Sequence, residues 1–255
     1  MTAVHQGSVP VSVITPVFNA AATIETTVRS VLSQHMGDLE LILVDDGSRD
    51  DSPTIIRSLA SEDSRIRFVL QEANTGPATA RNVGLSVARG RYIAFLDSDD
   101  LWLPEKLSRQ LDFMRDQDSP LTFTAYRKIR MDGSQSNVVS APESVRYDDL
   151  LKTNSIGMLT AMYDREKVGL RLLPEIRKRQ DYALWLSILR DGHEAKGLDE
   201  PLALYRIRRH SVSRNKGHAA KYQWRVYREL EHLSLMRSLW YFMHYAWNGY
   251  RKSRI

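Results

Sequence analysis

The segment FLDSDD, residues 95–100, places three carboxylates within four positions directly after an apolar run. If Asp97, Asp99 and Asp100 were all ionised they would repel one another, and partial burial would disfavour the charged forms unless a cation or hydrogen bonds compensated. Carboxylate and water oxygens are the ligands that Mg2+ and Mn2+ prefer, often together with substrate phosphates. The pattern therefore indicates a divalent metal site. A second interpretation stays open here, because Asp99 or Asp100 could cap a helix that begins near Pro104.

Three further polar segments follow apolar runs in the first hundred residues. They are Thr15-Pro16-Val17-Phe18-Asn19, Asp45-Asp46-Gly47-Ser48 and Asn74-Thr75-Gly76-Pro77. The second segment also has the composition of a plain turn followed by a helix cap. These segments indicate a binding site only if the fold brings them together.

Strands and helices are predicted to alternate over the same hundred residues. Apolar runs predict buried strands at 9–15, 39–44, 65–70 and 91–96. Helical spacing of apolar residues, or a Ser-Pro start, predicts helices at 23–34, from Ser52 onward, and at 77–88. This alternation is typical of an α/β fold with a parallel, doubly wound sheet covered on both faces. Ligands of such sheets bind outside the carboxyl ends of the strands, where the four polar segments would converge.

The second half of the chain is predicted to complete the same sheet. LTFTAYRKIR, the Asp132-Gly133 turn and QSNVVS predict a hairpin, and IGMLTAMYD, residues 156–164, predicts a further strand. No linker, repeat or low-complexity segment separates this part from the first half. One domain is therefore expected.

The composition narrows the class of protein. A chain of 255 residues can bury a substantial core, and the absence of cysteine excludes disulfides, zinc ribbons and thiol catalysis. Neither a basic, apolar leader nor an apolar stretch of about 18 residues is present, so a soluble or peripheral cytoplasmic protein is expected. Residues 206–255 contain 12 basic and two acidic residues, whereas residues 1–205 contain 24 basic and 29 acidic residues. The positive net charge of the chain, +5, therefore comes from the tail.

Five fragments, in this order, resemble the family 2 inverting glycosyltransferases with a GT-A fold: VSVITPVFNA, ELILVDDGSRDDS, NTGPATARNVGL, GRYIAFLDSDDLWLP and QDYALWL. The resemblance implies an α/β GT-A (Rossmann-like) domain with a mostly parallel central sheet and a nucleotide-sugar donor across its carboxyl edge. On this basis we predict a GT-A domain at 9–210, with a nucleotide-binding half at 9–100 and an acceptor-binding half at 101–210. A basic, aromatic helical tail at 211–255 is expected to follow.

The donor-binding residues follow from the same resemblance. Pro16 and Phe18 match the family's first nucleotide-contacting segment, and Asp46 matches the residue that accepts a hydrogen bond from uracil. A carboxylate can bind the imide N–H of uracil and rejects a base that presents only acceptors there, which favours a UDP-sugar. Arg81 matches the family's Ala-Arg-Asn element and is expected to orient the acidic cluster or contact the nucleotide, unless it is simply a solvated arginine.

The acidic cluster and a later aspartate carry the implied chemistry. Asp97-Ser98-Asp99 matches the family's DxD motif, with Asp99 expected to contact Mn2+ or Mg2+ and Asp97 to lie nearer the donor ribose or sugar. The ion would neutralise the departing diphosphate. An acceptor hydroxyl also needs a general base. Asp181, at the start of a predicted amphipathic helix, matches the Asp of the family's Glu-Asp pair, although Gln180 replaces the usual Glu and Asp181 could be a plain N-cap.

The remaining predictions concern the far end of the chain. Arg206 or His210 could touch the diphosphate. The Gln-x-x-Arg-Trp signature of processive members is absent, so the addition of one sugar per acceptor is predicted. From Tyr222 to Arg254 aromatic and basic residues mix, which suits a membrane headgroup interface, packing on the domain or on a second subunit, or, least of all, nucleic acid. We expect contact with the inner face of the cell membrane, where a polyprenyl-diphosphate-linked acceptor would present its sugar, and no nucleic acid partner.

The expected activity is that of a metal-dependent hexosyltransferase (EC 2.4 class) in O-antigen, capsule or exopolysaccharide biosynthesis, using a UDP-hexose or UDP-N-acetylhexosamine and a glycan or lipid-linked acceptor. One alternative is a catalytically degenerate GT-A scaffold or sugar-binding protein, which the intact set of Asp46, Asp97, Asp99 and Asp181 disfavours. A lesser alternative is a sugar nucleotidyltransferase, but PVFNAAAT lacks the glycine and lysine of a loop that cradles a triphosphate.

Overall fold

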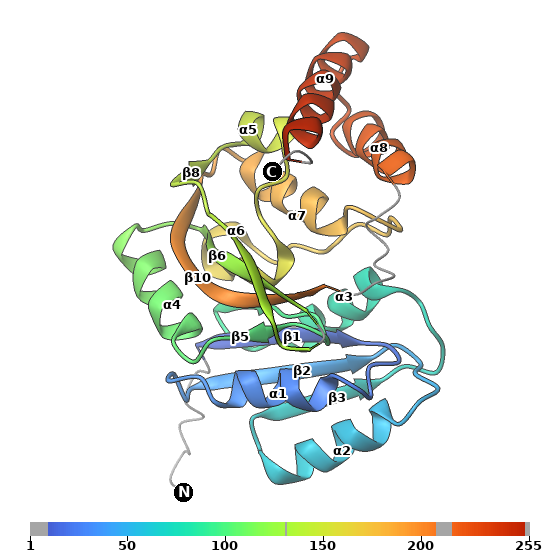
Figure 1. Ribbon diagram of the computed structural model, residues 1–255, viewed down its shortest axis with the longest axis vertical. Coiled ribbons are helices and arrows are strands. Elements are labelled where there is room, and N and C mark those ends of the chain that lie inside the picture. Colours follow the sequence, from blue (N-terminus) through green and yellow to red (C-terminus); the bar gives the residue numbers. More distant parts are fainter. Residues whose placement is uncertain (1–9, 131, 208–215, 253–255) are drawn as a thin grey trace, which may run out of the picture.

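The computed structural model of the protein describes residues 10–130, 132–207 and 216–252. Within these ranges the strands form one ten-stranded sheet in the order β3-β2-β1-β4-β9-β6-β10-β5, with β7 paired to β6 and β8 paired to β10 (Figure 1). The strands are β1 (Val11–Val17), β2 (Leu39–Asp45), β3 (Ile66–Leu70), β4 (Tyr92–Phe95), β5 (Leu101–Trp102), β6 (Leu121–Arg130), β7 (Gln135–Val139), β8 (Ser144–Val145), β9 (Ala161–Asp164) and β10 (Ala195–Ile207). The helices are α1 (Ile24–Leu32), α2 (Ser52–Glu62), α3 (Pro77–Val87), α4 (Lys106–Asp116), α5 (Tyr147–Lys152), the 3-10 helix η1 (Met158–Thr160), α6 (Arg165–Val168), α7 (Gln180–Leu189), α8 (Lys216–Arg225), the π-helical turn η3 (Val226–Leu230) and α9 (Leu235–Lys252).

The first four strands form the parallel half of the sheet. β1 pairs in parallel with β2 and with β4, and β2 pairs in parallel with β3. The predicted alternation of strands and helices is therefore confirmed. β1 ends at Val17 instead of residue 15, because Pro16 and Val17 still pair with Val44 and Asp45. The Ser-Pro start led us to expect Ser52 as the N-cap of the helix predicted from that residue, but Asp51 occupies the N-cap of α2.

Apolar residues of the parallel strands alternate between two cores. In β1, Val11 and Val13 belong to a core that includes residues of α1, α2 and α4, whereas Ile14 belongs to a core with α3, α5 and α7. Ala94 and Phe95 of β4 divide in the same way. Because a strand presents successive side chains on opposite faces, both faces of the sheet need a cover of helices. The doubly wound arrangement predicted for this half is confirmed.

The second half of the sheet is mixed. β9 runs antiparallel to its neighbours β4 and β6, whereas β10 pairs in parallel with β6. The predicted hairpin is present as β6 and β7. Of the strand predicted at 156–164 only Ala161–Asp164 is extended, because Met158–Thr160 forms a 3-10 turn. Since β4 pairs directly with β9, one sheet runs through both halves of the chain.

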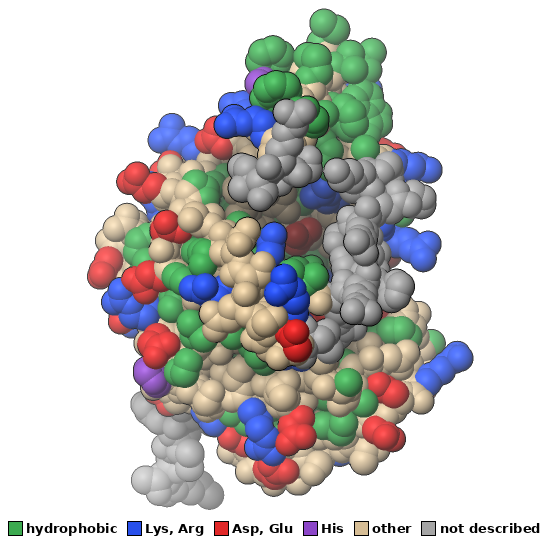
Figure 2. All heavy atoms as spheres, viewed as in Figure 1, with side chains coloured by type: hydrophobic (Ala, Val, Ile, Leu, Met, Phe, Trp, Pro, Cys, Tyr) green, Lys and Arg blue, Asp and Glu red, His purple; other side chains and the backbone are tan. Residues whose placement is uncertain are grey.

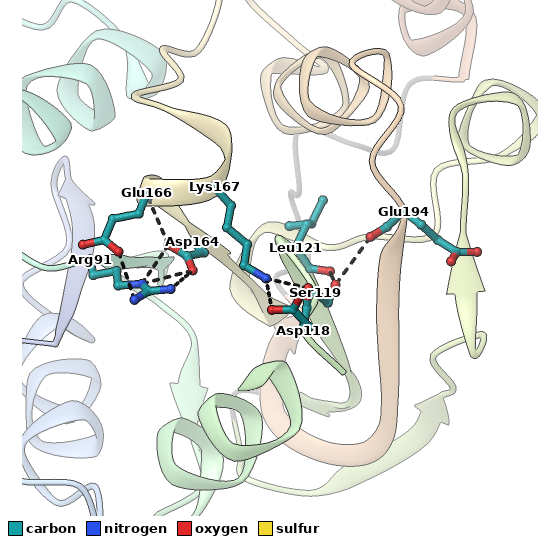
Figure 3. Close-up of polar contacts among 8 residues, drawn as sticks. All are labelled: Arg91, Asp118, Ser119, Leu121, Asp164, Glu166, Lys167 and Glu194. Atoms are coloured by element: carbon teal, nitrogen blue, oxygen red, sulfur yellow. Dashed lines mark hydrogen bonds and ion pairs between the residues drawn. The ribbon is translucent and has the colours of Figure 1, made fainter. Parts of the chain in front are cut away.

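Ion pairs join the two halves at the amino end of β4. Arg91 precedes β4, and its guanidinium donates to both carboxylate oxygens of buried Asp164, with Nη2 2.7 Å from Oδ2 (Figure 3). The Nη1 atom of Arg91 lies 2.9 Å from a carboxylate oxygen of Glu166. Lys167 pairs with Asp118 nearby. These contacts secure the sheet at the end opposite the carboxyl ends of the parallel strands.

The tail is helical, as predicted, and one side of it packs on the second half of the domain. Tyr227 of η3 is buried and donates its hydroxyl to the carbonyl of Leu151. The hydroxyl of Tyr241 donates to Asp148 Oδ1 at 2.6 Å, which fixes α9 against α5. Within the described part of the chain, no helix is long and apolar enough to cross a membrane.

Candidate active site

A cavity of about 330 Å3 opens at the carboxyl ends of β1, β2 and β4. Its walls come from the end of β1, the turn after β2, the loop and first turns of α3, and the acidic turn after β4. The lining residues are Pro16, Val17, Phe18, Asp46, Asn74, Pro77, Arg81, Asp97, Ser98 and Asp99. This set contains six of the seven predicted site residues, so the predicted convergence at one sheet edge is present. The seventh, Asp181, does not line this cavity.

The loop that precedes α3 holds the carboxylate of Asp46. Its Oδ1 accepts from the backbone N–H of Thr75 at 2.7 Å and from the Thr75 hydroxyl at 2.9 Å, and its Oδ2 accepts from the N–H of Gly76 at 2.8 Å. Asp45, not Asp46, makes the turn bond, accepting from the N–H of Ser48 at 3.0 Å. Asp46 therefore does more than complete the turn after β2, because its carboxylate holds the loop before α3. A carboxylate oxygen with one bond keeps a lone pair for a donor in the cavity.

Arg81 orients the acidic turn. It lies on α3, is 7% exposed, and its Nη2 donates to Oδ1 of Asp97. The simple interpretation of Arg81 as a solvated arginine is wrong. Asp97 and Asp99 both line the cavity, and Oδ1 of Asp97 is engaged in this ion pair.

Two threonines of α1 and its N-cap hold the backbone of the acidic turn. Thr23 Oγ1 donates to the carbonyl of Ser98 at 2.9 Å, and Thr27 Oγ1 donates to the carbonyl of Asp100 at 2.9 Å. Neither threonine was among the residues predicted from the sequence. The available signal was their spacing, because threonines four residues apart, beside buried Ile24, lie on the side of the helix that faces the protein.

Asp100 plays a structural part that the sequence did not indicate. It is buried, and its Oδ1 accepts from the backbone N–H of Arg206 at 2.8 Å, which ties the end of β10 to the acidic turn. Burial raises the pKa of the Asp100 carboxyl well above its usual range, and the charges of Asp97 and Asp99 add to this. The suggested capping role is wrong, because α4 begins at Lys106 with Glu105 as its N-cap. His210 lies outside the described residues.

The donor atoms of the acidic turn fit a hard cation. Asp97 and Asp99 bring two carboxylates to one cavity, with Ser98 between them. Across 10–130, 132–207 and 216–252, no three or more His, Asp or Glu side chains are arranged to hold a metal by themselves. Mg2+ is typically bound by one or two carboxylates together with substrate phosphates and water. The residues present match that mode of binding.

Asp181 lies at the start of α7, directly after Gln180, which lines a second cavity. It is not the N-cap, because Arg179 holds that position with a φ of +67°. Apart from Asp181 and Ser187, every residue of α7 is buried, so the helix is apolar on almost all sides instead of amphipathic as predicted. The amide of Asn154 approaches Oδ2 of Asp181 at 3.5 Å.

The second cavity has a volume of about 420 Å3 and adjoins the first, sharing Asn74 and Pro77 with it. Its other lining residues are Thr75, Gly76, Ala78, Thr79, Glu175, Ile176, Arg177 and Gln180. Gln180 directly precedes Asp181. The two cavities thus connect the acidic turn with the segment that leads into α7.

Comparisons with known sequences point to one family. The family described as Glycosyl transferase family 2 matches residues 12–171. The chain is 48% identical over 243 residues to the putative teichuronic acid biosynthesis glycosyltransferase TuaG of Bacillus subtilis, covering 95% of this chain and 96% of that protein. It is 37% identical over 243 residues to the UDP-Glc:α-D-GlcNAc-diphosphoundecaprenol β-1,3-glucosyltransferase WfgD of Escherichia coli, covering 95% of this chain and 94% of that protein.

Solved structures share the fold at low sequence identity. S. aureus TarS 1–349, solved in complex with UDP, matches with a TM-score of 0.65 and 21% identity, covering 78% of this chain and 60% of that chain. The mannosyltransferase PcManGT from Pyrobaculum calidifontis, solved with GDP-Man and Mn2+, matches with a TM-score of 0.59 and 20% identity, covering 84% of this chain and 60% of that one. The chain thus spans about three fifths of these longer proteins, and the likeness confirms the predicted α/β fold.

Proposed function

This chain belongs to glycosyl transferase family 2, and we propose that it transfers one sugar from a UDP-sugar to a hydroxyl of a lipid-diphosphate-linked glycan, with inversion at the anomeric carbon, in the assembly of a surface polysaccharide. The observation that carries this proposal is the convergence of Asp46, Arg81, Asp97 and Asp99 on one cavity. The name of WfgD supports both substrate classes, because it gives a UDP-sugar donor and a diphosphoundecaprenol-linked acceptor. The name of TuaG supports polysaccharide assembly.

Uracil is proposed to lie between Phe18 and Asp46. Phe18 is 46% exposed where it lines the cavity, so its ring is presented to a flat base. Oδ2 of Asp46 would accept the imide N–H of uracil with the lone pair that Gly76 leaves open. Cytosine presents an acceptor at that position, and two facing acceptors repel. This difference is our reason for proposing UDP as the nucleotide carrier.

Asp99 is proposed to hold Mn2+ or Mg2+ together with the donor diphosphate, and Asp97 to support it near the ribose or sugar. When bound, such an ion stabilises the negative charge that develops on a leaving diphosphate. The ion pair with Arg81 keeps the carboxylate of Asp97 directed at the cavity before any donor arrives. Prior orientation of this kind lowers the cost of reorganisation during the reaction.

Asp181 is proposed as the general base. It would take the proton from the acceptor hydroxyl as the oxygen attacks the anomeric carbon, on the face opposite the leaving diphosphate, which inverts the configuration in a single displacement. The helix that carries it is anchored by a nearly continuous apolar surface that includes Tyr182 and Trp185. A base on a rigid, buried helix keeps a fixed position relative to the cavity.

The outer side of α9 is proposed to rest on the inner face of the cell membrane. Met236, Trp240, Met243, Trp247 and Tyr250 recur at steps of four and three residues, so they lie along one side of the helix. Met236 is 76% exposed, Trp240 55% and Trp247 61%. Figure 2 shows hydrophobic side chains gathered over this end of the molecule. A helix with exposed tryptophans on one side suits the boundary between headgroups and acyl chains, where a lipid-linked acceptor would be found.

A thermal-shift panel of nucleotides and nucleotide sugars, with and without Mn2+, tests the donor assignment. We expect UDP and UDP-sugars to raise the melting temperature only when Mn2+ is present, and Asp99→Ala to lose the metal-dependent part of this rise. Indifference of the wild-type protein to every nucleotide in the panel would remove the proposal.

A further inference from the structure

A cationic segment, Arg177-Lys178-Arg179, connects the second cavity with the tail. Arg177 is exposed and lines the cavity that adjoins the donor cavity, together with one acidic residue, Glu175. Directly after the segment come Gln180, which lines the same cavity, and Asp181. Positive charge therefore borders the place from which the proposed base acts.

α9 holds Arg179 in an unusual conformation. Its φ of +67° lies in the left-handed region, which arginine rarely adopts. Its Nη2 donates to the hydroxyl of Tyr245 at 2.7 Å, and its guanidinium lies 5.3 Å from the centroid of that ring. Strained backbone of this kind persists only where surrounding contacts hold it, and it gathers at ligand sites. The strain turns the chain so that Arg179 meets the tail and Asp181 follows on α7.

Neither Arg177 nor Arg179 is within ion-pair distance of a carboxylate in the part of the chain that the structure describes. Other arginines close by in the sequence differ: Arg171 is paired with Asp191, and Arg190 with Glu231. A guanidinium offers a planar fork of donors that matches the oxygens of a phosphate. Arg177, which lines the cavity, and Arg179, which keeps donors beyond the one given to Tyr245, together favour an anion with several oxygens.

The exposed side of α9 continues from the same place. Tyr245 contacts Arg179 on the inner side of the helix, whereas Met243 and Trp247, two positions away in either direction, are exposed on the outer side. Asn248, also on the inner side, donates to the carbonyl of Lys152 at 3.3 Å. A cationic segment in contact with the inner side of α9 and an apolar stripe on its outer side match a ligand that carries an anionic head and a hydrocarbon chain.

We propose that Arg177 and Arg179, with Lys178 between them, bind the diphosphate of the lipid-linked acceptor, and that its hydrocarbon chain follows the outer side of α9 toward the membrane. The inference rests on the proposed function for the class of acceptor. It adds the residues that recognise the acceptor's diphosphate and separates them from the acidic turn, which serves the donor diphosphate. The acceptor sugar would then extend from these arginines toward Asp181.

Calorimetric titration of the whole 255-residue chain with geranyl diphosphate tests the assignment, with UDP and Mn2+ present at saturation so that the donor cavity is filled. The wild-type protein and the control Arg57→Gln, an exposed residue of α2, should bind geranyl diphosphate more tightly than geraniol or inorganic diphosphate. Arg177→Gln should weaken binding about tenfold, and the double variant Arg177→Gln/Arg179→Gln about a hundredfold, because each loses charge-assisted hydrogen bonds. Equal binding by wild type and Arg177→Gln, or equal affinity for geranyl and inorganic diphosphate, would overturn the inference.

Two further measurements distinguish this inference from general binding of anionic lipids and from the proposed binding of UDP. Flotation with vesicles of phosphatidylcholine and phosphatidylglycerol should be the same for wild type and Arg177→Gln; loss of flotation would mean that the arginines bind anionic headgroups in general, against the inference. UDP affinity, measured without geranyl diphosphate, should not change in either variant. A wild-type protein that binds geranyl diphosphate but not UDP would contradict the proposed donor while leaving the arginine site standing.

Discussion

Replacing Asp46 with asparagine should change both the stability of the loop before α3 and the choice of nucleotide. The carboxylate accepts three hydrogen bonds, two at Oδ1 from Thr75 and one at Oδ2 from Gly76. An asparagine that keeps the bonds to Thr75 must direct its NH2 group at the N–H of Gly76, so one bond is lost and two lose their charge. A hydrogen bond to a charged group contributes about 1.5–3 kcal/mol, and we therefore expect a loss of about 2–4 kcal/mol in the free energy of unfolding.

The same exchange reverses the hydrogen-bonding character of the atom proposed to meet the base. Where Oδ2 of Asp46 accepts from uracil, the NH2 group of an asparagine donates, and it can pair with the ring nitrogen of cytosine. UDP affinity should fall about tenfold to a hundredfold, and the preference for UDP over CDP should shrink or reverse. Titration calorimetry with UDP and CDP, together with urea unfolding, measures both effects.

Asp45→Asn is the matched control. Asp45 is equally buried and accepts one bond, from the N–H of Ser48, but it does not line the cavity. This variant should lose stability and keep the preference for UDP. If Asp46→Asn retained the UDP to CDP ratio of the wild type, the reasoning that places uracil on Oδ2 would be refuted, whatever happened to the stability.

Three other predictions follow from separate parts of the molecule. Asp181→Asn should keep wild-type UDP affinity but lose at least about a hundredfold in the rate of sugar transfer, as expected for a missing general base; full turnover would remove this assignment. Burial alone would raise the pKa of Glu40, but hydrogen bonds, led by that from the Ser12 hydroxyl, lower this pKa overall. The contribution of ionised Glu40 to the free energy of unfolding is therefore present above the ordinary glutamate pKa and is lost as the pH falls through the lowered pKa. Glu40→Gln should therefore lower the free energy of unfolding, measured by urea titration, by about 2–4 kcal/mol at pH 7 and by much less at pH 3. The same difference from the wild type at both pH values would contradict this prediction. Trp240→Glu/Trp247→Glu should abolish vesicle flotation without lowering the free energy of unfolding, because both side chains are more than half exposed; retained flotation would remove α9 as the membrane contact.

The parallel half of the fold was predictable because its local signals agree. Each strand there is a short apolar run, and each connecting helix has either helical spacing of apolar residues or a proline at its start, so boundaries fell within about two residues of the prediction. The second half of the chain carries fewer local sequence signals of this kind. β5 has only two residues, and β10 extends over Ala195–Ile207 through register shifts near Pro201. Such strands exist because of their neighbours in the sheet, which the sequence pattern does not specify.

The site was predictable where residues follow strand ends and unpredictable where distant partners support them. Six residues meet because parallel strands deliver their carboxyl ends to one edge. Thr23 and Thr75 are ordinary threonines in the sequence, yet one binds the acidic turn across 75 positions and the other holds Asp46 across 29. The error over α7 has a related cause. Gln180 is a polar residue in the sequence, yet it is buried and donates its side-chain amide to the carbonyl of Ile176.

The contacts of α9 connect membrane binding with the choice of acceptor. Its inner side is fixed at three points, Tyr241 to Asp148, Tyr245 to Arg179 and Asn248 to Lys152. Because these bonds leave α9 little freedom to move against α5 and the start of α7, a membrane that binds its outer side would also set the height of Asp181 above the lipid. A base at a fixed height reaches only hydroxyl groups at a matching distance from the lipid diphosphate. On this reasoning the enzyme would select its acceptor partly by the length of the glycan, which agrees with the proposed addition of one sugar instead of a growing polymer.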